Sequence, residues 1–196
     1  MLLKNICMEN NPRCFWCTSH PLYIKYHDEE WGKPVYDDAK LFEMLLLESF
    51  QAGLSWFTIL QKRENFRIAF NDFNVNKIAE YTDDKFQELI INSGIIKNKL
   101  KIKAAITNAK LFIEIQNEFG TFSNYLWGFT NHTIINNQDI SKSHFYVTSP
   151  LSDAISKDLK KRGFKFVGST TIYAYLQAVG VINDHTSDCF IRQGII

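Results

Sequence analysis

The stretch C-F-W-C-T-S-H-P-L-Y-I-K-Y-H-D-E-E-W, residues 14–31, combines two kinds of side chain that seldom occur so close together. Metal ligands occupy four of its positions: Cys14, Cys17, His20 and His27. Large aromatic rings occupy five others: Phe15, Trp16, Tyr23, Tyr26 and Trp31. Metal ligands indicate a cross-link and aromatic rings indicate a pocket, so we expect this stretch to organise the fold.

A second pair of metal ligands lies at the far end of the chain, in N-D-H-T-S-D-C, residues 183–189. Together with Cys14 and His27, the pair His185 and Cys189 would form a two-Cys, two-His set suited to tetrahedral zinc. The H-x-x-x-C spacing would put the last two ligands on one side of a helical turn. Because four protein ligands leave no position for a water molecule, such a zinc would be structural and would join the two ends of the chain.

Spacing alone leaves two alternatives to this zinc site. The C-x-x-C motif formed by Cys14 and Cys17 could combine with His20 or His27 into a local metal site. The cysteines and histidines could also be unligated side chains packed inside the protein, as both residue types often are.

The composition, 45% hydrophobic and 22% charged residues, is typical of a soluble globular protein. A length of 196 residues predicts one domain, residues 1–196, which we expect to form two helical lobes around one groove. No apolar run approaches the roughly 18–20 residues of a membrane helix, and residues 1–8 lack the apolar core of a signal peptide. We therefore expect a cytoplasmic protein with reduced or metal-bound cysteines and no membrane partner. We also expect it to be a monomer.

Hydrophobic periodicity predicts an all-α fold. Helical patterns cover residues 39–50, 56–70, 75–81, 83–93, 95–119, 149–163 and 170–179. The least periodic part, residues 127–149, predicts the longest loop, and no convincing series of strands is present.

Glu48 stands where a core residue is expected. On a 3.6-residue period it shares a stripe with Leu41 and Leu45, whereas Glu43 points the opposite way. A carboxyl group on an apolar face is either paired with a buried partner or held for chemistry, and burial without a partner raises its pKa. If the rings of Tyr23, Tyr26, Trp31 and Trp56 surround it, they form an aromatic slot suited to a planar or cationic ring.

Residues 149–180 have the layout of a helix-hairpin-helix element. Ser149 and Pro150 predict a helix start, Gly163 predicts its end, and five residues, 164–168, lead to the next helix. Backbone N–H groups of such a hairpin can hold a DNA phosphate without reading sequence. The net charge of only +1 gives no global attraction for DNA, although lysines cluster at 97–103 and 157–165, where they could equally cover a solvated helix face.

Several long blocks of this chain, in this order, resemble the bacterial 3-methyladenine DNA glycosylase I family of the helix-hairpin-helix superfamily. The resemblance extends from Cys14 to about Cys189. The blocks are P-L-Y-I-K-Y-H-D-E-E-W-G (21–32), L-F-E-M-L-L-L-E (41–48), Q-A-G-L-S-W (51–56), K-R-E-N-F-R (62–67), S-G-I-I-K-N-K (93–99), K-K-R-G-F-K-F-V-G-S-T-T (160–171) and N-D-H (183–185).

The resemblance implies roles for individual residues. It implies one structural Zn²⁺ per chain, a base pocket around Glu48, and a turn at Gly53 and Leu54 that enters the duplex. The zinc ligands would be Cys14, His27, His185 and Cys189, and the pocket would be formed by Glu48 with Tyr23, Tyr26, Trp31, Trp56 and Trp16. Phosphate contacts would come from the hairpin and the start of the next helix, at Lys165, Val167, Gly168 and Thr171. Ser49 and Phe50 depart from smaller or polar residues in other members, so Phe50 could alter the pocket edge or the DNA contact.

The activity implied by the resemblance is release of 3-methyladenine from double-stranded DNA. The enzyme would flip the damaged nucleotide out and hydrolyse its N-glycosidic bond, leaving an abasic site for base-excision repair. Asp184, beside a zinc ligand, is left outside the catalytic set, and the absence of an obvious nucleophilic lysine after the hairpin predicts a monofunctional enzyme without lyase activity. Two alternatives are a zinc-stabilised protein that binds lesions without cutting and a metal-dependent hydrolase, which would need an open metal position.

Overall fold

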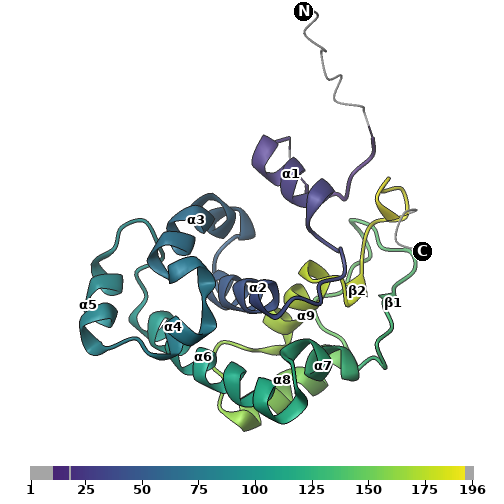
Figure 1. Ribbon diagram of the computed structural model, residues 1–196. Helices are drawn as coiled ribbons and strands as arrows, with labels where there is room; N and C mark the ends of the chain where they lie inside the picture. Colours follow the sequence, from purple (N-terminus) through teal and green to yellow (C-terminus); the bar gives the residue numbers. More distant parts are fainter. Residues whose placement is uncertain (1–10, 18, 193–196) are drawn as a thin grey trace, which may run out of the picture.

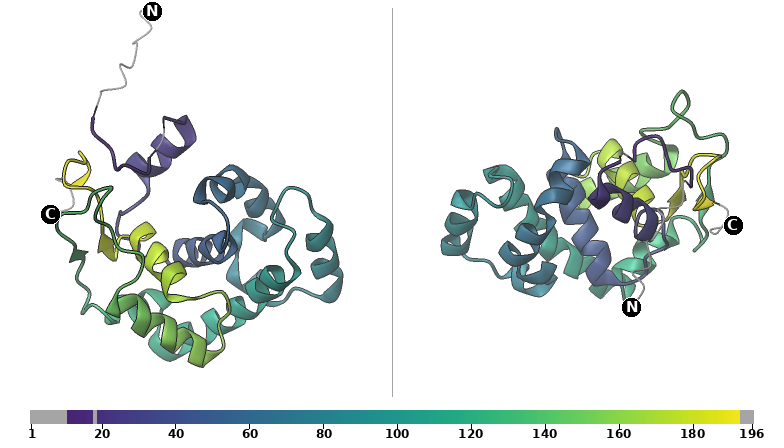
Figure 2. Two further views of the ribbon diagram at one scale, coloured as in Figure 1. Left: turned by 180° about the vertical axis from the view of Figure 1, so that it is seen from behind. Right: turned by 90° about the horizontal axis from the view of Figure 1, so that it is seen from above.

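The computed structural model describes residues 11–17 and 19–192, which form a mostly helical protein (Figures 1 and 2). Within these residues no helix has the length and apolar character needed to cross a membrane. The elements are α1 (Pro21–Glu29), α2 (Asp38–Gln51), α3 (Trp56–Ala69), a 3-10 turn η1 (Asn71–Phe73), α4 (Val75–Ala79), α5 (Asp83–Ile91), α6 (Lys99–Phe119), α7 (Phe122–Gly128), β1 (Ile135–Asn136), α8 (Pro150–Arg162), α9 (Ser169–Ala178) and β2 (Ile182–Asn183).

Helix α2 forms the centre of the molecule. Figure 1 shows α3, α4 and α5 on one side of it and α1 with the two short strands on the other. Every residue from 41 to 50 is buried, because α2 packs against α3, α6, α7 and α9. The buried apolar side chains on both sides of α2 belong to one continuous core.

Glu43 and Glu48 lie on different faces of α2, and both are buried. Glu43 accepts hydrogen bonds from Arg63 Nε at 2.8 Å, Arg67 Nη2 at 2.9 Å and Lys40 Nζ at 3.1 Å. The expectation that only one face of α2 is buried is therefore wrong. Helix α3 covers the face that carries Glu43, and ion pairs neutralise the Glu43 carboxylate.

The seven predicted helices are confirmed as α2 to α6, α8 and α9, with small shifts at their ends, whereas α1 and α7 were not expected from the sequence. The long helix was expected from residue 95, but α6 begins at Lys99 because Asn98 caps it, accepting a hydrogen bond from the Lys101 N–H at 3.1 Å. Ser149 caps α8 in a capping box with Ser152, and Gly163 ends α8 with a φ of 108°. The longest loop does fall between α7 and α8.

A two-residue parallel strand pair was not expected from the sequence. Ile135 of β1 pairs with Ile182 of β2, and Asn136 pairs with Asn183. Strands this short carry no alternation of polar and apolar residues, so the pairing could not be recognised. It attaches the long loop between α7 and α8 to the segment that follows α9.

Asp38 connects the start of α2 to the start of α7. Its Oδ2 accepts hydrogen bonds from the Phe122 N–H at 2.8 Å and from Gln116 Nε2 at 2.7 Å, and its Oδ1 accepts one from the Ser123 N–H at 2.8 Å. A carboxylate in this place satisfies helix N–H groups that have no partner within α7.

The substitution Asp38→Ala is expected to lower the free energy of unfolding by about 2–3 kcal/mol, since it removes hydrogen bonds to a charged acceptor and leaves donors unpaired. Urea denaturation measures this change. Glu114→Ala on the exposed face of α6 is the matched control and should change stability by no more than about 0.5 kcal/mol. Equal effects of the two substitutions would contradict the role given to Asp38.

Candidate functional site

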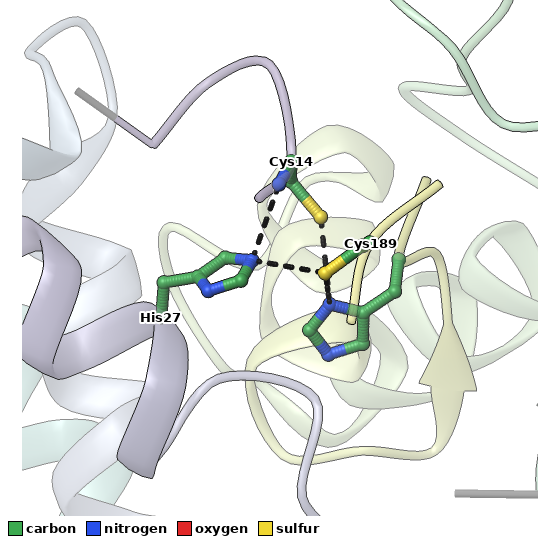
Figure 3. Close-up of side chains that lie close together, drawn as sticks. Cys14, His27 and Cys189 are labelled. Atoms are coloured by element: carbon green, nitrogen blue, oxygen red, sulfur yellow. Dashed lines mark hydrogen bonds between the residues drawn. The ribbon is translucent and has the colours of Figure 1, made fainter. Parts of the chain in front are cut away.

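Two cysteines and two histidines from the two ends of the described chain come together in one buried group. Cys14, His27, His185 and Cys189 offer ligand atoms that all lie within 4.8 Å of one another. Figure 3 shows Cys14, His27 and Cys189 pointing toward one another from the N-terminal segment, α1 and the segment after β2. All four residues are buried, so the group could hold a metal ion.

The neighbours of His27 suit it to metal binding. Its Nδ1 lies 2.8 Å from Asp28 Oδ1, which leaves Nε2 to face Cys189 Sγ at 3.5 Å. Arg13 in turn donates two hydrogen bonds to Asp28 through Nε at 2.8 Å and Nη2 at 2.7 Å. The pKa of Asp28 is lowered, because the hydrogen bonds and charge of Arg13 outweigh the effect of partial burial. A carboxylate behind a histidine orients the ring and increases its basicity toward a metal.

The two sulfur atoms titrate as a pair. Contact with Cys189 and burial raise the pKa of Cys14, whereas the hydrogen bond from Cys14 and further hydrogen bonds from His185 and His27 lower that of Cys189. The lowered pKa of Cys189 favours its thiolate, which is the form of cysteine that binds a metal.

The cluster agrees with the predicted set of four and not with the local alternative. Cys17 and His20 lie outside the group, and the His20 side chain instead caps α1, accepting from the Leu22 N–H at 3.2 Å. One detail was wrong. His185 and Cys189 lie in an irregular turn and not on a helical turn, and the Cys189 N–H bonds to the Thr186 carbonyl at 2.9 Å.

Beside this cluster, a cavity of about 300 Å³ opens between α1, α2, α3, α9 and the loop before α8. All six residues expected around a base pocket line it, and so does one side of α9. The expected residues are Trp16, Tyr23, Tyr26, Trp31, Glu48 and Trp56. The structure thus brings together side chains that are up to 40 positions apart in the sequence.

Glu48 is the only carboxylic acid besides Asp184 among the residues that line this cavity. The side chain of Glu48 is 4% exposed, and its Oε2 has no hydrogen-bond partner among the described residues. Burial without a compensating charge raises its pKa to about 8. A buried carboxyl group in this state favours a ligand that brings a hydrogen-bond donor or a positive charge.

Two further polar atoms at the cavity have no partner in the described chain. These are the hydroxyl of Tyr26 and Nε1 of Trp56, whose rings lie 5.2 Å apart. Burial raises the pKa of Tyr26, so its hydroxyl stays protonated and can donate. The cavity therefore offers two unpartnered donors and one unpartnered carboxyl oxygen within aromatic walls.

The aromatic walls also contact the metal cluster. Trp31 packs edge to face on His185 with ring centres 4.6 Å apart, and Trp16 lies 5.3 Å from His27. Trp16 and Trp31 contact each other at 4.8 Å. The cluster thus supports the wall of the cavity from behind, without having a ligand atom among the cavity-lining residues.

Some lining residues were missed in the sequence. Thr170, Tyr173, Ala174 and Gln177 are spaced three or four apart and form one face of α9, a helical stripe that could have been recognised. Phe145, Tyr146 and Val147 come from the long loop and gave no periodic signal. They leave an exposed apolar rim at the mouth, where Phe145 contacts Phe15 at 5.5 Å.

Asp184 lines the cavity, but both of its carboxylate oxygens are engaged. Oδ2 accepts hydrogen bonds from the Tyr173 hydroxyl at 2.6 Å and from Gln177 Nε2 at 2.7 Å, and Oδ1 accepts one from Asn137 Nδ2 at 2.7 Å. Asp184 therefore differs from Glu48, which has a free oxygen.

The segments expected to contact DNA are next to residues that line the cavity. Gln51, which precedes the turn of Gly53 and Leu54, lines the cavity, and so does Thr170, which follows the hairpin. Gly53 has a φ of 80° and Leu54 is exposed. Among the hairpin residues Lys165 is exposed, Val167 is buried, Gly168 precedes α9, and Thr171 lies half-buried in the first turn of α9.

Phe50 does not reach the cavity or the surface. It is fully buried and packs against Phe66 at 4.8 Å and Phe70 at 5.9 Å, on the α3 side of α2. The expectation that Phe50 could alter the pocket edge or the DNA contact is therefore wrong, since the residue fills the core.

This combination defines a class: a helical protein with an aromatic cavity for a planar ring, an unpartnered carboxyl group in that cavity, and a Cys/His cluster that closes the chain. Residues 16–193 match the family model for methyladenine glycosylases, and the chain belongs to this family.

Curated and solved relatives cover nearly the whole chain. It is 45% identical over 182 residues to DNA-3-methyladenine glycosylase 1 of Escherichia coli K12, covering 93% of this chain and 97% of that protein. It is 44% identical to the DNA-3-methyladenine glycosylase of Haemophilus influenzae, covering 90% and 96%. The 3-methyladenine DNA glycosylase I of Staphylococcus aureus, solved to explain its recognition of 3-methyladenine, superposes with a TM-score of 0.88 at 37% identity, covering 92% and 96%.

The raised pKa of Glu48 predicts a pH-dependent cost in stability. The group has a usual pKa of 4.5 and a folded-state pKa of about 8, so between these values it ionises in the unfolded chain and stays protonated in the folded one. The unfolded state is therefore favoured as pH rises through this window. Glu48→Gln should gain stability relative to wild type across it, by up to about 1.4 kcal/mol per pH unit.

The control for this prediction lies on the same helix. The pKa of Glu43 is lowered, because the hydrogen bonds and charge of Arg63 outweigh burial, so its contribution is present at neutral pH and is lost in acid. Glu43→Gln should therefore destabilise the protein at pH 7. Urea unfolding of the three proteins at several pH values measures both effects, and a pH-independent difference between wild type and Glu48→Gln would contradict the assignment.

Proposed function

We propose that this protein is a DNA-3-methyladenine glycosylase, which flips 3-methyladenine out of DNA and hydrolyses its N-glycosidic bond. The observation that carries this proposal is the unpartnered, buried carboxyl group of Glu48 inside an aromatic cavity. The names and 44–45% identities of the two curated relatives support it. The product would be an abasic site, as expected for the first step of base-excision repair.

The cavity residues suit the chemistry of the methylated base. Methylation at N3 places a positive charge on adenine, which makes the base a good leaving group and weakens its bond to deoxyribose. Stacking on Tyr and Trp rings favours the cation over neutral adenine by about 1–2 kcal/mol in a desolvated site. Glu48 would accept hydrogen bonds from the amino edge of the base and stabilise its charge.

Hydrolysis would follow from the departure of the base. The sugar left behind has oxocarbenium character, and water would trap it. Among the described residues no lysine lines the cavity, and the oxygens of Asp184 are engaged, so we infer a monofunctional reaction without a covalent lyase step.

Contact with double-stranded DNA is assigned to the two segments next to the cavity-lining residues. Gly53 and Leu54 would enter the duplex where the nucleotide has left. The α8–α9 connection would act as the helix-hairpin-helix element, with Lys165, Val167, Gly168 and Thr171 around a backbone phosphate. The start of α9 supports this role, since Gly168 caps it without a side-chain hydrogen bond and leaves its N–H groups free of a side-chain cap. We expect the protein to act as a monomer.

The metal in the Cys/His cluster is assigned as one structural zinc ion. Zinc bonds of about 2.0–2.3 Å in a tetrahedron imply ligand separations of about 3.3–3.8 Å. His185 Nδ1 lies 3.4 Å from the sulfur of Cys14 and 3.4 Å from that of Cys189, which fits this geometry. Four protein ligands would leave the ion no role in the reaction, in contrast to a metal-dependent hydrolase.

Base release from methylated DNA tests the proposal. DNA treated with dimethyl sulfate should release 3-methyladenine, identified by chromatography, and Glu48→Gln should lower kcat/KM by roughly 10- to 100-fold through loss of a charged hydrogen bond. Because kcat/KM reports ionisation in the free enzyme, the wild-type value should rise with pH toward a plateau above about 8, and this rise should be absent in Glu48→Gln.

A protein that only binds lesions would give a different result. It would retain methylated DNA without releasing any base, and its Glu48→Gln variant would behave like wild type. If folded, metal-loaded protein released no base, the result would favour a protein that binds damaged DNA without cutting it.

Removal of a zinc ligand tests the structural metal. Cys189→Ser should reduce bound zinc from one per chain to nearly none, lower the melting temperature and weaken binding of free 3-methyladenine, because Trp31 and Trp16 lose their support. Elemental analysis and thermal unfolding measure the first two effects. Cys17→Ser is the matched control, and loss of zinc in this variant would favour the local C-x-x-C site instead.

A further inference from the structure

Helix α6 contacts two segments that are proposed to bind DNA: the turn after α2 and the connection between α8 and α9. Two of its side chains, Lys101 and Asn108, are buried polar residues spaced seven apart, so they project from the same face two turns from each other. Neither belongs to the cavity. Each contacts a different loop, and together they connect regions more than 100 residues apart in the sequence.

Lys101 closes the C-terminal end of α2. Its ammonium group donates hydrogen bonds to the Phe50 carbonyl at 2.7 Å and the Ala52 carbonyl at 2.6 Å, immediately before Gly53 and Leu54. Carbonyl groups at a helix end have no partner within the helix and carry negative partial charge, which a cation stabilises. Burial lowers the pKa of Lys101, as expected for an ammonium group that has exchanged water for these two carbonyls.

Lys101 differs from the neighbouring lysines in its burial. The basic cluster at residues 97–103 was expected to cover a solvated face or to attract DNA. Lys97, Lys99 and Lys103 are exposed, but Lys101 is 5% exposed and serves the backbone of α2.

Asn108 holds the α8–α9 connection by both ends of its amide. Its Nδ2 donates to the Lys165 carbonyl at 3.0 Å, and its Oδ1 accepts from the Lys165 N–H at 2.9 Å. The next residue, Phe166, has a φ of 56°, a backbone conformation that a residue with a side chain seldom adopts without support. The amide of Asn108 supplies that support one residue before the strained position.

Phe166 links the two contacts. The Lys101 ammonium group lies 5.9 Å from the centre of the Phe166 ring, a cation–π distance. The turn after α2 and the connection before α9 are therefore held by one helix face and also contact each other through Lys101.

We propose that Lys101 and Asn108 are positioning residues for DNA engagement: α6 sets the separation between the turn that enters the duplex and the hairpin that holds the phosphate. This inference rests on the proposed function, which assigns those two DNA contacts. A fixed distance between these two segments matters, because the flipped base reaches the cavity only when both contacts form at the same time. One segment must hold the phosphate while the other enters the duplex. Flexible loops would have to be ordered at the moment of binding, which weakens affinity.

The test compares Lys101→Met and Asn108→Ala with wild type in two assays. Binding of free 3-methyladenine, which needs only the cavity, should change by less than about twofold. Binding of a DNA duplex that contains a tetrahydrofuran abasic analogue should weaken by roughly tenfold in each variant. The slope of log Kd against log salt should also decrease by about one in Asn108→Ala, because one phosphate contact is lost.

Matched controls separate positioning from charge and from folding. Lys110→Met removes an exposed charge from the same helix and should leave duplex binding within about twofold. Lys101→Arg keeps a cation that can donate to both carbonyls and should restore most of the affinity. Where Asn108→Ala fails to fold, Asn108→Ser, with a smaller polar group, takes its place.

The outcomes distinguish this inference from the function on which it rests. Wild-type protein that binds neither free 3-methyladenine nor the duplex would overturn the proposed function and the inference with it. Wild-type protein that binds both, with variants that bind the duplex equally well, would overturn the positioning role alone. Variants that lose free-base binding in parallel with duplex binding would also overturn it, because the substitutions would then act on the cavity.

Discussion

An uncompensated carboxyl group in the most buried helix is the constraint on which this structure depends. Helix α2 is covered on all faces and carries two glutamates. Glu43 is neutralised by Arg63, Arg67 and Lys40, whereas Glu48 has no ionic partner among the residues that the structure describes, and burial raises its pKa to about 8. The protein thus places a group that opposes folding at its centre, and the surrounding core must offset the cost. Such a group is useful when a cationic ligand completes it.

One wall of the cavity contacts the Cys/His group, whose residues lie far from α2 in the sequence. Cys14 and Cys189 lie at opposite ends of the described chain, and the histidines between them contact the tryptophans that face Glu48. A metal ion in this group would restrict both ends and, through Trp16 and Trp31, one wall of the pocket. The role is mechanical, since no ligand atom of the group lines the cavity. Under the proposed function, affinity for a cationic ring would come from the aromatic faces and the carboxyl group, both held in place before binding.

Under the proposed function, attraction for DNA would be local, because the net charge of the chain is only +1. The α8–α9 connection and the turn after α2 offer backbone groups and one exposed lysine, and α6 holds both through Lys101 and Asn108. The helix thus uses a buried lysine and a buried asparagine where apolar residues would be expected. Their polar groups are satisfied by loop backbone, which allows them to be buried at little cost and makes the loops rigid.

The sequence by itself determined seven of the helices, several of their caps and the residue types of the site, but it did not reveal α1 or α7. Ser149, Pro150 and Gly163 act on neighbouring residues, and the stripe of Glu48 follows from helical spacing, so short-range rules are sufficient for both. The Cys/His set was also visible, because those residue types are scarce and stand at the two ends. Only the tertiary structure decided which carboxylate is paired, that Phe145 and Tyr146 border the cavity, that β1 pairs with β2, and that Lys101 is buried among lysines that are not. Each of these depends on contacts between residues distant in sequence, which no local pattern encodes.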